Sequence, residues 1–362
     1  MERLGIVGLP NAGKSSLFNA LTGGSAVVAA HPFSTTETNM GVAQVPDDRL
    51  ARLSAMSQSR KTVPTGFEFV DIAGLAKGAS SGEGMGNRFL GGIREVDALC
   101  LVLRAFEDDE VVGGTDPLAD LQTLELELVL ADAASVENQI DKRRKAAKSD
   151  KSLAGEVAAL EKANQLLGSE GIPLYRAATL TADERQLLRP FFLLTNKPML
   201  AVVNLGEDQL DPATVDQLTK PVFDELGSEG AVLAVSVQLE AEAARLADDE
   251  RAELLEGLGL GEGALPRVAR AAYHLLGRRT FFTTGDKESR AWTFRSGAKA
   301  PECAGVIHSD LQRGFIRAEV IHWDDLLDIG SWTKAKELGK LRVEGKDYEV
   351  VDGDVLEIRF NV

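Results

Sequence analysis

The chain has 362 residues, enough for two or three domains, and 44% of them are hydrophobic, which suffices for a proper core. No apolar run approaches the ~20 residues of a membrane span, no signal peptide precedes the first predicted strand, and Cys100 and Cys303 form no C-x-x-C motif. The net charge of −16 is concentrated in residues 205–262, which hold 15 acidic and 3 basic residues, so bulk charge gives no reason to expect DNA binding. We therefore expect a cytoplasmic protein without a membrane partner, disulfides or a cysteine metal site.

A phosphate-binding sequence lies close to the start of the chain. Residues 8–15, GLPNAGKS, fit the pattern G-x-x-x-x-G-K-[ST]. The apolar residues 4–7 before it predict a buried strand, and residues 16–21 after it predict a helix. In that context backbone N–H groups and the helix N-terminus surround an anion. Lys14 would reach the β- and γ-phosphates, and the Ser15 hydroxyl would bind Mg²⁺.

The polar stretch at residues 22–50 predicts a loop with little periodicity. In phosphate-loop NTPases a loop Thr completes the Mg²⁺ shell and senses the γ-phosphate, and Thr35 is the candidate here. Thr36 is its neighbouring rival, and an ordinary Thr in a turn is the alternative.

A second segment with nucleotide-sensing features follows a strand predicted at residues 65–70. That strand delivers Asp71, which is placed to hold Mg²⁺ through water, and Gly74, whose amide is placed to donate to the γ-phosphate. The glycine-rich residues 77–87 predict a mobile switch, with a plain surface loop as the alternative.

The middle of the chain combines a buried strand with long helices. Residues 98–103 are continuously apolar and predict a central parallel strand. Apolar residues at helical spacing in 121–140 and 157–167 predict an antiparallel helical hairpin. Its basic tip, residues 142–148, suits phosphates, although a solvated turn fits the pattern equally well. A capping box at residues 181–184 begins a short helix that returns to the core.

Two more apolar runs predict buried strands, at residues 198–203 and 231–235. They end where GTPases carry their N-K-x-D and S-A-x base-recognition loops, here NLGE at residues 204–207 and Ser236. Guanine offers paired N–H donors that suit a short Asp carboxylate. Glu207 is one methylene longer, and Leu205 replaces the Lys that packs along the base. The sequence therefore argues against guanine specificity.

A second compact unit is predicted from about residue 278. Its predicted strands are residues 281–284, 291–294, 315–321, 345–351 and 355–360. The last two flank an Asp-Gly-Asp turn at residues 352–354, which is typical of a hairpin. One helix is predicted near residues 304–313, so we expect a small mixed sheet with one helix across it.

These motifs resemble the Obg-like ATPases of the YchF group over essentially the whole chain. The matching stretches are GIVGLPNAGKSSLFNALT, DIAGLAKGASSGEGMGNRFL, the NLGE loop, GFIRAEVI and EGKDYEVVDGDVLEIRFNV. The resemblance implies an α/β fold in three parts: a P-loop nucleotide-binding domain with a mostly parallel sheet (residues 1–120 and 196–277), an inserted antiparallel helical hairpin (121–195) and a C-terminal β-grasp module, the TGS domain (278–362).

The resemblance also implies an activity and a set of site residues. The activity is a slow, ATP-preferring and Mg²⁺-dependent switch that associates with ribosomes, with the large subunit as the expected contact and GTP as a weaker ligand. Phosphate contacts fall on Asn11, Ala12, Gly13, Lys14, Ser15 and Ser16. Base contacts fall on Asn204, Leu205, Glu207 and Ser236. Mg²⁺ contacts fall on Ser15, Thr35 and Asp71, and catalytic roles on Lys14, Thr35 and Gly74. A monovalent cation such as K⁺ is expected near Asn11, and the protein is expected to be a monomer.

Three positions bear on hydrolysis. Leu75 stands where many GTPases have their water-positioning Gln, although an apolar residue is usual in the family that this chain resembles. Thr38 replaces a Pro that is usual there, which affects the first switch. Gly113 stands where members usually place a His shortly after the R-x-F-E run. We therefore expect slow hydrolysis even for this family.

Two alternatives to a slow ATPase stay open. One keeps the fold and makes GTP the substrate, against which the altered NLGE loop argues. The other is a nucleotide-gated ribosome-binding module with negligible hydrolysis, which Leu75 keeps open because its side chain cannot orient water.

Overall fold

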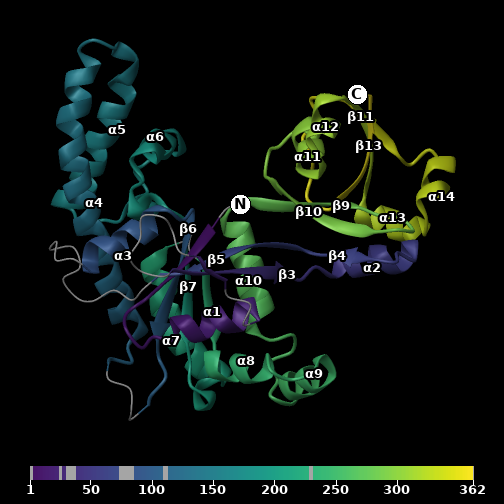
Figure 1. Cartoon of the computed structure of the whole chain (residues 1–362). Helices are drawn as coiled ribbons and strands as arrows, with labels where there is room; N and C mark the ends of the chain where they lie inside the picture. Colours follow the sequence, from purple (N-terminus) through teal and green to yellow (C-terminus); the bar gives the residue numbers. More distant parts are fainter. Residues whose placement is uncertain are drawn as a thin grey trace. The chain divides into compact units, whose positions relative to one another are not determined.

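The computed structural model (Figure 1) describes residues 3–23, 27–29, 38–72, 85–108, 113–227 and 231–361. The chain forms two compact units: Met1–Ala43 with Glu68–Ala272, and Gln44–Phe67 with Tyr273–Val362. Residues 44–67 therefore belong to the second unit, although the sequence places them within the range of the nucleotide-binding domain. In the part of the chain that the structure describes, no helix combines the length and apolar content needed to cross a bilayer.

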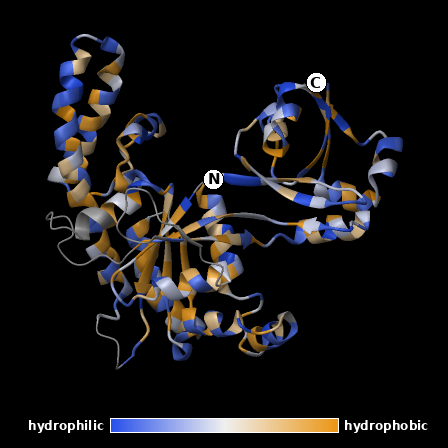
Figure 2. Ribbon diagram, in the orientation of Figure 1, coloured by the Kyte–Doolittle hydropathy of each residue, from blue (hydrophilic) through white to orange (hydrophobic). Residues whose placement is uncertain are grey.

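The first unit is built on a seven-stranded sheet whose order is β2-β3-β5-β1-β6-β7-β8. Its strands are β2 Val27–Ala29, β3 Thr38–Val45, β5 Thr65–Asp71, β1 Arg3–Val7, β6 Ala98–Arg104, β7 Met199–Asn204 and β8 Ala231–Val235. The five strands from β5 to β8 pair in parallel. Every residue of β6 and β7 is buried, and Figure 2 shows these central strands mostly in the hydrophobic colour. The predicted parallel sheet is confirmed.

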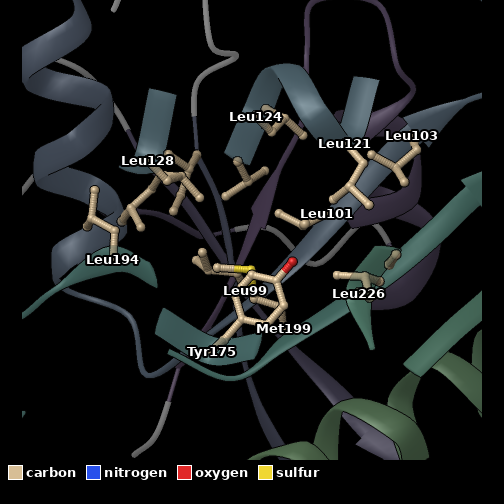
Figure 3. Close-up of a cluster of buried hydrophobic side chains, with 14 of the residues drawn as sticks. Leu99, Leu101, Leu103, Leu121, Leu124, Leu128, Tyr175, Leu194, Met199 and Leu226 are labelled. Atoms are coloured by element: carbon tan, nitrogen blue, oxygen red, sulfur yellow. The ribbon is translucent and has the colours of Figure 1, made fainter. Parts of the chain in front are cut away.

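The core beside this sheet is made of side chains from both strands and helices. Leu99, Leu101 and Leu103 point to one face of β6 because successive side chains of a strand alternate. They pack with Met199 of β7 and with Leu121 of α4, as Figure 3 shows. This packing fixes β6 and β7 side by side, so their last residues, Arg104 and Asn204, are neighbours in register.

The helices described in the first unit include α1 Lys14–Thr22, α3 Met85–Arg94, α4 Pro117–Ala147, α5 Ala154–Asn164, α6 Ala182–Leu188, α7 Pro212–Leu226, α8 Val237–Ala243 and α9 Asp248–Gly257. A further helix, α10 Ala264–Leu275, continues from the first unit into the second. The predicted capping box is present, because Thr181 and Glu184 exchange hydrogen bonds at the start of α6.

The inserted hairpin consists of α4 and α5, which run side by side in Figure 1. The helix α4 has 31 residues, and Asp116 caps its N-terminus by accepting from the N–H groups of Leu118 and Ala119. Val136 and Leu160 are among the apolar side chains that pack the two helices together. The predicted helical hairpin is confirmed.

The second unit contains a six-stranded mixed sheet in the order β12-β11-β13-β9-β10-β4. Its strands are β12 Arg342–Glu344, β11 Phe315–His322, β13 Asp354–Phe360, β9 Arg278–Thr283, β10 Ser289–Arg295 and β4 Thr62–Val63. Its helices are α2 Asp48–Ser57, α11 Ala300–Ile307, α12 Ser309–Arg313, α13 Trp323–Ile329 and α14 Trp332–Glu337. One apolar cluster joins the sheet to α11, and another joins it to α2, α13 and α14.

Three local predictions were wrong. Residues 22–50 are not one loop, because β3 reaches Val45 with alternating buried side chains and α2 begins at Asp48. The helix predicted near 304–313 is two helices, which meet at the extended residue His308. Residues 345–351 contain no strand and form no hairpin with β13, which instead pairs with β11 and β9.

The position of β13 has a clear cause in the turn before it. The Asp352 carboxylate accepts from the Thr280 N–H of β9 at 2.8 Å and from the Arg49 guanidinium of α2 at 2.7 Å. These two bonds hold the turn against β9 and α2, so β13 enters the sheet beside β9.

Candidate nucleotide site

The phosphate loop has a backbone that requires glycine at two positions. Gly13 lies at φ +95°, and a β-carbon there would lie 2.4 Å from Nδ2 of Asn204. A β-carbon on Gly8 would lie 2.5 Å from the carbonyl oxygen of Val102 in β6. Asn11 also has a left-handed backbone, at φ +65°. A loop that alternates in this way before a helix N-terminus directs N–H groups into an anion-binding hollow.

Lys14 is the buried cation of this loop. Its Nζ donates to the carbonyl oxygen of Leu9 at 2.9 Å. Burial lowers the pKa of Lys14, and the charge of Asp71 opposes part of that shift. A phosphate oxygen would supply the negative charge that favours the ammonium form.

Ser15 and Asp71, both predicted from the sequence to contact Mg²⁺, are joined by a hydrogen bond. The Ser15 Oγ donates to Oδ2 of Asp71 at 2.9 Å. Burial raises the pKa of Asp71, against hydrogen bonds from Ser15 and Asn39 and the charge of Lys14. A hydroxyl and a carboxylate are hard oxygen ligands, and they fit Mg²⁺, which takes one or two protein ligands besides phosphates and water. Among the described residues, no group of three or more His, Cys, Asp or Glu side chains forms a metal site.

Four predicted positions cannot be placed in this geometry. Thr35, its rival Thr36, Gly74 and the apolar Leu75 lie outside the described residues. Their roles stay predictions.

Asn204 joins the two halves of the predicted site. Its Nδ2 donates to the Ala12 carbonyl at 3.0 Å, and its Oδ1 accepts from the Val237 N–H at 3.1 Å. The side chain is only 4% exposed. Both polar atoms of the Asn204 side chain therefore bond to backbone groups of the protein, and they clamp the phosphate loop to the first residue of α8.

The remaining base-loop residues differ in exposure. Leu205 is buried in the core of the first unit, and its N–H donates to the Val235 carbonyl at 2.9 Å. Glu207 is exposed and begins a single 3₁₀ turn, Glu207–Gln209. Ser236 is 5% exposed, and within the described part of the chain its Oγ has no hydrogen-bond partner. A buried hydroxyl without a partner costs free energy, which a ligand atom would recover.

Arg104 organises the loop that leaves β6. Its Nε donates to the Phe106 carbonyl at 3.1 Å, and its guanidinium lies 4.5 Å from the centroid of the Phe106 ring. Gly113 has a φ of +142°, and a β-carbon there would lie 3.3 Å from Nη1 of Arg104. Position 113 is therefore close to Arg104 and is strained for any residue other than glycine.

Comparison with known proteins identifies the family. Residues 3–129 match a family model described as 50S ribosome-binding GTPase, and residues 279–361 match the C-terminal YchF-GTPase model, described as a protein of unknown function. A Bacillus subtilis (strain 168) protein named ribosome-binding ATPase YchF is 48% identical over 363 residues, 99% of either chain. The chain belongs to the YchF family. Another YchF protein, from Escherichia coli O157:H7, is 45% identical over 369 residues, again 99% of either chain. A solved structure, that of the Schizosaccharomyces pombe YchF GTPase, superposes with a TM-score of 0.85 at 33% identity and covers 99% of this chain and 97% of that one.

Sequence reasoning missed three residues of this YchF-family site. Asn39 binds Asp71 from β3, in a stretch predicted to be a loop. Arg104 was noted only as part of the R-x-F-E run. Gln209, whose contacts are described below, is two residues beyond the NLGE motif. Asn39 and Gln209 had no motif signal, because each binds a segment that is distant in the sequence.

Proposed function

We propose that this protein is an ATP-binding, slowly ATP-hydrolysing switch that associates with ribosomes. The joined phosphate and base loops support this proposal, with Asn204 as the link between them. The names of the bacterial relatives agree with it, while the Schizosaccharomyces pombe protein is named a GTPase. The choice between ATP and GTP therefore needs a test of its own.

The chemistry that we assign to these residues is positioning and charge stabilisation. Lys14 and the loop N–H groups bind and orient the phosphates. Ser15 and Asp71 would hold Mg²⁺, which would neutralise phosphate charge, and a K⁺ ion near Asn11 would add to this. Thr35 and Gly74 are proposed to bind the metal shell and the γ-phosphate.

Base preference is tested by calorimetric titration of the purified protein with ATP and with GTP. Guanine would lose one pair of hydrogen bonds at Glu207 and Leu205. ATP should therefore bind roughly 5- to 150-fold more tightly than GTP, a difference of about 1–3 kcal/mol. GTP binding more tightly than ATP would overturn the preference. The informative variant is Glu207→Asp, which should improve GTP binding, with the exposed neighbour Asp208→Asn as its control. Leu205→Lys is unsuitable, because it would bury an ammonium group in the core.

Turnover measured in parallel separates the enzyme from a module that only binds. Slow release of phosphate from ATP is expected. Phosphate release that does not exceed the rate in a Lys14→Ala control would instead favour a nucleotide-gated ribosome-binding module, the alternative that Leu75 keeps open.

We propose that ribosome contact involves the basic tip of the helical hairpin. Lys142, Lys145 and Lys148 are exposed there, whereas Arg144 is paired with Glu161 at 2.7 Å. Phosphate-rich RNA would be repelled by the acidic stretch 205–262. The C-terminal module is the other proposed contact. This proposal rests on the resemblance of the chain to the YchF family.

A charge-reversal variant tests the hairpin. The triple change of Lys142, Lys145 and Lys148 to Glu should weaken co-sedimentation with ribosomes and lower its salt dependence by about one unit of slope per lost phosphate contact. ATP affinity should not change, and Lys220→Glu, an exposed lysine of the acidic stretch, is the control. Equal co-sedimentation of both variants would reject the tip as a contact. Deletion of residues 278–362 is a poor test of the module, because it would strip Leu50 and Leu53 of their packing partners.

A further inference from the structure

The base loop is closed by the side chain of Gln209. The Oε1 of Gln209 accepts from the Gly206 N–H at 2.8 Å, and the backbone N–H of Gln209 donates to the Gly206 carbonyl at 3.2 Å. These two bonds enclose Glu207 within a tight 3₁₀ turn. The backbone of Glu207, and with it the direction of its Cα–Cβ bond, is therefore set by this turn.

The same side chain ties the turn to the end of β6. Its Nε2 donates to the Ala105 carbonyl at 3.1 Å. Close by, the Asn204 carbonyl accepts from the N–H groups of Ala105 and Phe106 at 2.9 and 3.1 Å. A β-carbon on Gly206 would lie 3.7 Å from Cβ of Phe106, so the two segments are in close contact.

A primary amide suits this position because one group must accept on one side and donate on the other. A Glu side chain of the same length accepts but cannot donate when ionised, and it would place negative charge against the Ala105 carbonyl. A Met side chain of similar length does neither. The arrangement thus depends on the chemistry of Gln209 and not only on its size.

We propose that Gln209 is a positioning residue for base selection by the bound nucleotide. It does not need to touch the base: it holds Leu205, Gly206 and Glu207 in the conformation that distinguishes adenine from guanine. This inference rests on the proposed function, in which these residues face the base. A loop fixed before binding discriminates between ligands better than one that each ligand can reshape, because the wrong base then meets unmatched polar groups.

The experiment compares Gln209→Met and Gln209→Glu with the wild-type protein and with Asp208→Asn, which changes an exposed side chain of the same turn. Dissociation constants for ATP, GTP and inorganic tripolyphosphate are measured for each. We expect both Gln209 variants to lose roughly five- to tenfold of the preference for ATP over GTP. We expect tripolyphosphate affinity to stay constant, because the phosphate loop is unchanged.

Each other result has one meaning. A wild-type protein that binds both nucleotides equally refutes the proposed base preference whatever Gln209 does. A wild-type preference that survives in both Gln209 variants overturns the inference, and so does an equal loss in Asp208→Asn. A parallel fall of ATP, GTP and tripolyphosphate affinity would show a merely structural role, which also overturns it.

Discussion

The phosphate loop and the core of the second unit are built in opposite ways. The loop is a run of eight residues whose conformation depends on local backbone geometry, such as the left-handed φ of +95° at Gly13 and of +65° at Asn11. The second core instead draws on two segments far apart in the sequence, residues 44–67 and 273–362. A local backbone demand leaves a motif in the sequence, whereas packing between distant segments leaves only ordinary apolar positions.

The join between those two segments is extensive. Leu50 and Leu53 of α2 pack in one cluster with Phe282 of β9. Arg49 pairs with Asp352 at 2.7 Å and lies 5.1 Å from the centroid of the Phe282 ring. The segment 44–67 lies in the chain between the predicted metal ligands Thr35 and Asp71, so the second unit contains part of the chain that connects two parts of the nucleotide site.

Several substitutions test this comparison of the phosphate loop with the core of the second unit. The largest effect is expected from Leu53→Ala. Leu53 is fully buried, so truncation should lower the free energy of unfolding of the second unit by about 2–5 kcal/mol. Urea denaturation followed by tryptophan fluorescence is selective, because Trp292, Trp323 and Trp332 all lie in that unit. Leu101→Ala in the first unit is the matched control. A tryptophan transition that Leu53→Ala leaves in place would mean that residues 44–67 do not support the second core.

Much of the first unit could be predicted because its signals are local. The buried strands β6 and β7, the hairpin helices and the meeting of Ser15 with Asp71 all follow from runs or motifs of a few residues. The assignment of α2 to the second unit could not be predicted, since Leu50 and Leu53 indicate an apolar helix face but not its partner. The hairpin predicted for residues 345–360 was wrong for a related reason: the bonds of Asp352 to Thr280 and Arg49, which place β13, cross long stretches of sequence.

Lys14→Ala should have the next largest effect. This effect should be on ATP binding and should be confined to the phosphate loop of the first unit. Loss of a charge-assisted contact with phosphate is expected to weaken ATP binding by about 1.5–3 kcal/mol, roughly 10- to 150-fold. The tryptophan-monitored unfolding of the second unit should not change, and removing a desolvated ammonium group should not destabilise the first. Calorimetry and urea denaturation of one preparation measure both, with Lys220→Ala as the control. Unaltered ATP affinity would contradict the assignment of Lys14 to the phosphates.

A change of pH is expected to have a smaller effect on ATP affinity. Burial lowers the pKa of Lys14 from its ordinary value of 10.5, and bound phosphate favours the charged form. ATP affinity should therefore be constant while Lys14 is charged in the free protein and should fall as the pH rises through that lowered pKa. Lys14→Arg keeps its charge throughout and should lose the alkaline fall. Identical profiles for the two proteins would mean that another group controls the pH dependence.

The smallest effect, on the rate of ATP hydrolysis, is expected from substitution of Gly113, where the family resemblance implies a His but the backbone conformation favours glycine. The family resemblance implies a His at this position in most members, so we expect glycine here to remove a group able to orient the attacking water. The structure adds a cost to restoring it, because φ is +142° and a β-carbon would approach Nη1 of Arg104 to 3.3 Å.

Gly113→Ala carries the same backbone cost without an imidazole. The comparison that isolates the side chain is therefore Gly113→His against Gly113→Ala, in single turnovers at saturating ATP and Mg²⁺. We expect the His variant to hydrolyse ATP several-fold faster than the Ala variant, well short of the roughly 10²- to 10⁴-fold worth of a well-placed base, since strain displaces the ring. Equal rates with equal ATP affinities would place the group that handles water elsewhere in the chain.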